Sequence, residues 1–171
     1  EEAGHGFAHH GPEGFSDREK AVRGKQISEF KKKIIIGALL STIVFIGSFP
    51  EWFPFVKFLV SDGGLLSLLL LILSTPVQFY VGYDFYRGFW IAARNKTADM
   101  NTLIAIGTSA AYFYSVAVVL IPDIVTRAGL QPALYFDTAA VITTLIMLGR
   151  YFEAIAKGRA SQAIRKLIGL Q

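Results

Sequence analysis

Residues 63–83, GGLLSLLLLILSTPVQFYVGY, contain no charged side chain. A helix needs about 20 predominantly apolar residues to cross the hydrocarbon core of a bilayer. Soluble helices and strands instead scatter their apolar residues at periods of 3.6 or 2. This stretch therefore predicts a transmembrane helix.

Three further stretches, 34–53, 100–121 and 133–153, are similarly apolar. The first ends near Pro50 and Trp52, and Pro122 closes the next. Four such stretches in 171 residues, 53% of them hydrophobic, do not fit the buried core helices of a soluble protein. The sequence predicts an all-α membrane protein with four transmembrane helices within residues 30–158.

Lysine and arginine gather on one side of the predicted membrane. Positive charge in short loops marks the cytoplasmic side, and both chain ends and the loop after residue 83 are therefore predicted to be cytoplasmic. The residues that set this orientation are Lys31, Lys32, Lys33, Arg87, Arg94, Lys96, Lys157, Arg159, Arg165 and Lys166, against only Lys57 and Arg127 in the opposite loops.

The second span carries a helix breaker, Pro76, and then Gly82, so we expect a kink there. Beyond it, residues 84–95 alternate an apolar face with a polar one, which favours an amphipathic helix lying in the cytoplasmic interface. A plain helix end with an aromatic belt is the alternative. The expected apolar face consists of Tyr86, Phe89, Trp90 and Ala93.

The two ends of the chain are polar. Residues 1–29 form a polar N-terminal segment, and residues 159–171 continue the fourth helix as a cytoplasmic stalk. Within the first segment, His5, His9 and His10 are weak candidate metal ligands, although a solvated tail is the alternative. The sequence holds no cysteine and no basic stripe interleaved with aromatics, so thiolate metal sites and nucleic-acid binding are excluded.

Two carboxylates lie in or beside the fourth span. An acid within an apolar span is costly and is a functional candidate. Asp137 and Glu153 are sixteen residues apart, which is about 24 Å along a helix, so they would mark two mouths of one pathway rather than one site. Alternatively, Glu153 pairs with Arg150 or Lys157, and Asp137 caps the helix or contacts headgroups.

Met100 begins the third span, on the same predicted side as Glu153. A thioether is a soft ligand that suits monovalent copper, although a lone methionine is commonly a packing residue. The sequence holds no phosphate-binding glycine loop, phosphorylated-aspartate motif or nucleophile–base set. By itself this chain should catalyse nothing.

Three ordered blocks resemble copper-transporting P-type ATPases of the heavy-metal subclass: TPVQFYVGYDFYRGFW (75–90), TADMNTLIAIGTSAAYFYS (97–115) and YFDTAAVITTLIMLGRYFE (135–153) followed by a KGRASQAIRKLIGLQ stalk. The resemblance covers nearly all of residues 30–171. Residues 1–7 also look like the tail of the metal-binding domain that precedes the membrane part of such pumps. We expect a piece of a longer pump, in the plasma (inner) membrane of a prokaryote.

The resemblance implies roles for single residues. Met100 and Glu153 match the residues where the metal enters, and Asp137 falls where the family usually has a glutamate for metal release. Gly82 matches the second glycine of the family's kink, whose first glycine is Val81 here. Arg87, Arg94 and Lys96 would complete a platform that docks a copper chaperone or the N-terminal metal-binding domain.

The resemblance also implies cofactors and partners. Cu⁺ would be the transported ion, ATP and Mg²⁺ would bind in other domains of the same pump, and lipids would surround the helices. Silver or a divalent metal as cargo, or a stand-alone scaffold or channel-like protein without ATPase, are the alternatives. The sequence does not separate copper from silver.

Overall fold

The computed structural model describes residues 12–49, 51–53, 63–130 and 132–168. Within these ranges the regular structure is helical throughout. The helices are α1 (Pro12–Ser48), α3 (Gly63–Pro76), the π-helical turn η1 (Val77–Val81), α4 (Tyr83–Arg94), α5 (Met100–Leu120), α6 (Pro122–Arg127) and α7 (Phe136–Ile168).

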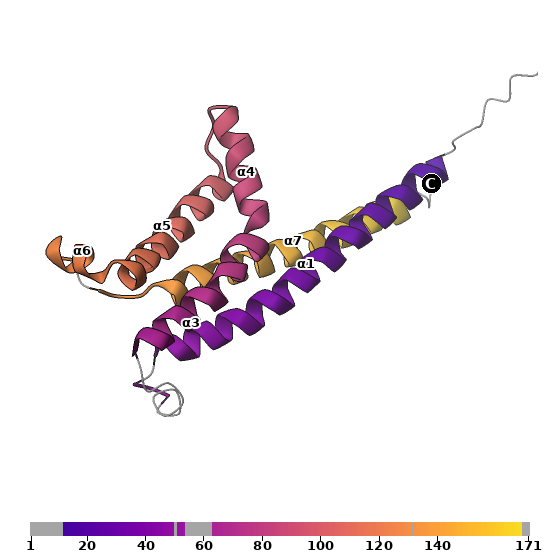
Figure 1. Ribbon diagram of the computed structural model, residues 1–171. Helices are drawn as coiled ribbons and strands as arrows, with labels where there is room; N and C mark the ends of the chain where they lie inside the picture. The colour runs from indigo at the N-terminus through magenta and orange to yellow at the C-terminus, as the bar shows by residue number, and fades with distance from the viewer. Residues whose placement is uncertain (1–11, 50, 54–62, 131, 169–171) are drawn as a thin grey trace, which may run out of the picture.

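The two longest helices, α1 and α7, lie side by side and antiparallel (Figure 1). The start of α1 and the end of α7 therefore lie at the same end of the molecule. Residues 12–33 of α1 are largely polar, yet they are part of the same helix, and α7 runs beside α1. Phe30 and Ile34 pack from α1 against the buried core. The sequence did not predict this extension of the first helix.

The α3 helix passes into η1 at Pro76, whose ring removes one backbone donor. The hydroxyl of Thr75 donates to the Leu71 carbonyl at 2.6 Å, and the Gly82 amide donates to the Val77 carbonyl at 3.1 Å, five residues back. Both bonds keep polar groups of this junction paired inside the protein, as an apolar surrounding requires. A new helix, α4, begins directly after Gly82.

Helices α4 and α5 form a hairpin (Figure 1). They approach closely at Gly88, where an added Cβ would lie 2.6 Å from the side-chain nitrogen Nδ2 of Asn101. Between them, Asp99 caps α5, which ends at Leu120 before Pro122. The predicted span at 100–121 therefore coincides with a helix in the structure to within one residue.

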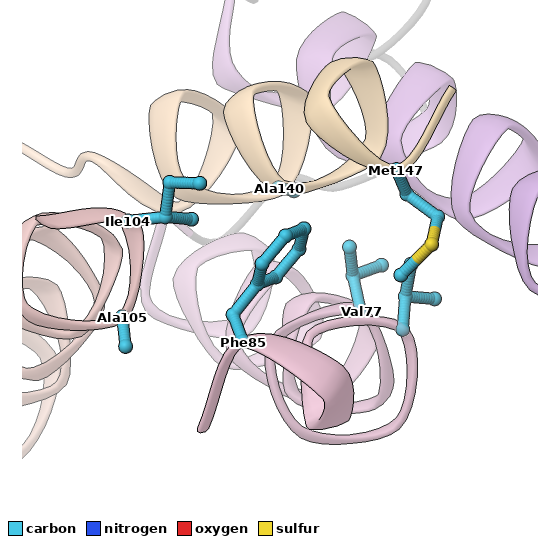
Figure 2. Close-up of a cluster of buried hydrophobic side chains, with 7 residues drawn as sticks. Val77, Phe85, Ile104, Ala105, Ala140 and Met147 are labelled. Carbon is cyan, nitrogen blue, oxygen red and sulfur yellow. The ribbon is translucent and has the colours of Figure 1, made fainter. Parts of the chain in front are cut away.

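Two apolar clusters hold the helices together. In the first, Phe85 of α4 points toward α7 near Ala140, and the Met147 side chain reaches toward Val77 (Figure 2). The second cluster joins α1, α3, α5 and α7 through Val44, Leu70, Tyr112, Phe136 and Ala139. Each cluster therefore joins helices from both halves of the chain.

Three of the described helical stretches are long and apolar enough to cross a membrane: Gly64–Val81, Met100–Leu120 and Phe136–Ser161. The apolar part of α1, residues 34–48, is shorter and follows three lysines directly. The described residues are thus helical, as predicted, and three of the four predicted spans coincide with helices of spanning length and composition. A fourth span and a kink remain predictions.

Candidate metal-uptake site

A hollow of about 520 Å³ lies between α1, α5 and α7. It brings Met100 and Glu153, which are 53 positions apart in the chain, to the walls of one cavity. Both are predicted site residues. The full lining is Gln26, Phe30, Met100, Arg150, Glu153, Ala154 and Lys157.

Met100 owes its position to the cap of α5. The amide of Thr102 donates to Oδ1 of Asp99 at 2.9 Å, and the Asp99 amide donates back to the Thr102 hydroxyl. This reciprocal pair is a capping box, which fixes the first helical turn. The Thr102 amide also lowers the pKa of Asp99, because it stabilises the charged carboxylate. The Met100 side chain is left more than half exposed at the hollow.

Arg150 ties α7 to α5 and to α4 at the hollow. Its guanidinium donates to the amide oxygen of Asn101, and it lies 4.7 Å from the centre of the Phe85 ring. Asn101 in turn donates to Asp99 at 2.6 Å. These contacts hold the start of α5 against α7, so that Met100 and Glu153 face the same space. From the sequence, Arg150 was expected only as an alternative partner of Glu153.

Glu153 forms an ion pair with Lys157 one helical turn later, at 2.6 Å. This is one of the two pairings that the sequence left open as alternatives to a metal role. Both side chains are more than half exposed. An exposed pair of this kind contributes little to stability, so the pairing does not remove the carboxylate from use by a ligand.

Asp137 lies in the first turn of α7, half-buried, at the far end from Glu153. Both acids belong to one continuous helix, and sixteen residues span about 24 Å. The structure therefore keeps them as two separate positions, as the sequence predicted.

The remaining candidates lie around α4. Gly82 is buried between η1 and α4, whereas Arg87, Arg94 and Lys96 are exposed. Lys96 adopts a left-handed conformation with φ of 53°, and Lys96 and Thr97 donate to the carbonyls of Ala93 and Ala92. This pattern is a Schellman motif, which ends the helix. Lys96 thus stops α4 in addition to carrying a charge.

The predicted apolar face of α4 differs from the face that packs inside the protein. Phe85 and Ala92 are buried, whereas Trp90 is 71% exposed and Ala93 is exposed. The packing of Phe85 was not predicted from the sequence, and the interfacial role of the other face remains a prediction. On its polar side, Asp84 pairs with Lys33 of α1 at 2.7 Å, a contact that sequence reasoning missed.

A buried polar group also escaped prediction. The Gln78 side chain, 2% exposed, donates to the Tyr86 hydroxyl at 2.7 Å and to the Thr108 hydroxyl at 3.1 Å. Tyr86 also pairs with Ser109. This network links η1, α4 and α5, and it fixes α4 against α5.

No group of three or more His, Cys, Asp or Glu side chains forms a metal site within the part of the chain that the structure describes. His5, His9 and His10 lie outside the described residues. Metal chemistry at the hollow would therefore depend on a thioether and one carboxylate, a weak and exchangeable ligand set.

No protein-family model matches the chain. It is 47% identical over 146 residues, or 83% of its length, to a probable copper-transporting ATPase PacS of Synechocystis. It is 40% identical over 159 residues, or 92% of its length, to a copper-exporting P-type ATPase of Bacillus subtilis. A PacS protein of Synechococcus elongatus is 39% identical over 158 residues. The chain covers 19–20% of these relatives.

Apolar helices of spanning length and these bacterial relatives together support an integral protein of a bacterial membrane. The resemblance to copper-transporting P-type ATPases is confirmed, since relatives with that name match over most of the chain.

Proposed function

We propose that this chain is part of the membrane domain of an ATP-driven exporter of monovalent copper, and that its hollow admits the ion. The observation that carries the proposal is the shared hollow of Met100 and Glu153. A thioether binds soft monovalent ions, and the carboxylate supplies the opposite charge. Two ligands bind weakly enough to pass an ion onward, as a transport pathway requires.

In this proposal residues 34–53 form the first of four spans, and the hollow lies on the cytoplasmic side. Lys31, Lys32 and Lys33, directly before the apolar part of α1, and the basic residues at the end of α7 support that orientation. Residues 1–29 would lead in from a metal-binding domain, and 159–171 would lead to the next domain. ATP and Mg²⁺ would act in the rest of a longer pump, as the length of the relatives suggests.

The end of α4 is the proposed docking platform, beyond a kink at Pro76 and Gly82. Arg87, Arg94 and Lys96 are exposed there, next to the exposed indole of Trp90. Exposed cations attract an acidic partner through long-range electrostatics, and an aromatic ring suits the headgroup region of a membrane. A copper chaperone or the pump's own metal-binding domain would deliver the ion here.

The function is tested with the full-length protein in membrane vesicles. We expect ATP hydrolysis and ATP-dependent metal accumulation that are stimulated by monovalent copper. Silver and zinc serve as comparison ions, because a thioether favours the soft monovalent ones. Stimulation by zinc alone, or by no metal, would contradict the proposal.

Asp137, at the other end of α7, is the proposed release residue. The substitution Asp137→Asn removes the negative charge and keeps the shape of the side chain. We expect slower metal release, measured as a lower maximal transport rate, with an unchanged KM for copper because the uptake hollow is about 24 Å away. A variant that transports at the normal rate would show that Asp137 is only an interfacial acid.

A further inference from the structure

The uptake hollow contains its own cations. Its lining includes two positive groups, Arg150 and Lys157, and one negative group, Glu153. An incoming metal cation therefore meets a site whose charged lining is net positive. Like charges at short range repel, so the site accepts a cation only if one of the two positive groups is held back or moves away.

Arg150 is the fixed cation. Its guanidinium is bound to Asn101 and lies over the Phe85 ring, which engages it away from Glu153. A planar guanidinium held by a hydrogen bond and an aromatic face loses little further freedom. Lys157 differs in each respect, because its side chain is 74% exposed and its described polar contact is with Glu153.

Lys157 is paired with the carboxylate of Glu153, which is the group that the metal would bind. Its ammonium lies 2.6 Å from Oε1 of Glu153. The lysine ammonium is a compact charge on a flexible stem, able to swing into solvent with its charge hydrated. Gln26 and Phe30 of α1 form another wall of the hollow.

We propose that Lys157 is the resident counter-cation of Glu153 and sets the affinity for the transported ion by competing with it. In the empty site Lys157 holds the ionised carboxylate at the hollow. The arriving monovalent ion displaces the ammonium, which moves out into water. Lys157 is thus a positioning residue that weakens metal binding. This inference rests on the uptake role of Glu153 proposed above.

The test is the copper dependence of ATP hydrolysis by the full-length protein, with monovalent copper held at known free concentrations by a thiol buffer. Lys157→Gln should lower the KM for copper about two- to threefold, because an exposed one-turn ion pair is a weak competitor. The maximal rate should not change. Lys157→Arg, which keeps the charge, should stay within twofold of the native KM.

Arg159→Gln is the matched control, since it removes the same charge from the same exposed stretch of α7 and is not part of the hollow. An equal fall of KM in both variants would mean a general charge effect and would overturn the proposal. A higher KM in Lys157→Gln would overturn it too. Loss of folded protein would lower the maximal rate and would not lower KM, so the expected fall in KM is specific.

Combining Lys157→Gln with Glu153→Gln separates this inference from the proposed function. Because the lysine acts through the carboxylate, the double variant should have the KM of Glu153→Gln alone. If Glu153→Gln itself leaves KM unchanged, the uptake role fails and the inference fails with it. If Glu153→Gln raises KM while Lys157→Gln behaves like Arg159→Gln, only the inference fails.

Discussion

Replacing Met100 by alanine, or Glu153 by glutamine, is expected to raise the KM for copper of the full-length pump about tenfold, with a smaller effect on the maximal rate. Each change removes one of the two proposed ligands at the hollow, and even the loss of a residue that only supports a metal ligand commonly weakens binding by about 10–100-fold. An effect confined to KM indicates lost binding rather than lost chemistry. The measurement is copper-stimulated ATP hydrolysis at buffered free copper.

Two methionine variants make this result specific. Met100→Leu keeps the volume and removes the sulfur, so it should behave like Met100→Ala if the thioether binds the ion. Met147→Leu makes the same exchange at a fully buried core position outside the hollow, and exchange of similar volumes is usually tolerated. It should keep the native KM. A native KM in Met100→Ala would rule out the uptake role of this methionine.

Elements marked by local signals were predictable from the sequence. The α5 helix spans Met100–Leu120 because Asp99 caps its start and Pro122 follows its end, and both signals lie within a few residues of the boundary. The Glu153–Lys157 pair was one of two pairings that the sequence left open for the same reason, since residues three or four apart on a helix are neighbours. Apolar length likewise predicted three helices of spanning length.

Features set by distant parts of the chain were not predictable. The polar start of α1 is helical where α7 runs beside it, and Lys33 pairs with Asp84, 51 residues away. The buried face of α4 depends on its packing against other helices, so the sequence did not predict that Phe85 and Ala92 are the residues buried inside the protein. Gln78 looked like an ordinary member of a span, yet it joins three elements through hydrogen bonds.

The residues that line the candidate site were likewise predictable only in part. The resemblance identified Met100 and Glu153, and the structure brings them to one hollow. Gln26 and Phe30 were not recognised, because their place in the wall depends on how α1 lies against α7. Arg150 was recognised only as a neighbour of Glu153, while its contacts with Asn101 and Phe85 require the packing of α4, α5 and α7.

The Gly82→Ala variant is expected to show the largest loss of stability. Gly82 is buried where η1 meets α4, and an added Cβ would collide with the backbone carbonyl oxygen of Gln78. A backbone atom cannot rotate away as a side chain can, so the helix junction itself must shift. Overpacking of this kind costs about 1–3 kcal/mol, and we expect inactivation several degrees lower.

The measurement is the temperature at which half of the purified full-length protein loses copper-stimulated ATP hydrolysis in detergent. Gly107→Ala is the control, because the same methyl group there meets nothing within 4 Å inside a helix, where alanine is favoured over glycine. It should leave the inactivation temperature unchanged or raise it. Equal temperatures for the two variants would mean that the junction between η1 and α4 yields freely. In that case Gly82 would not fix the position of α4, and the platform would be held chiefly by the Gln78 network and the Lys33–Asp84 pair.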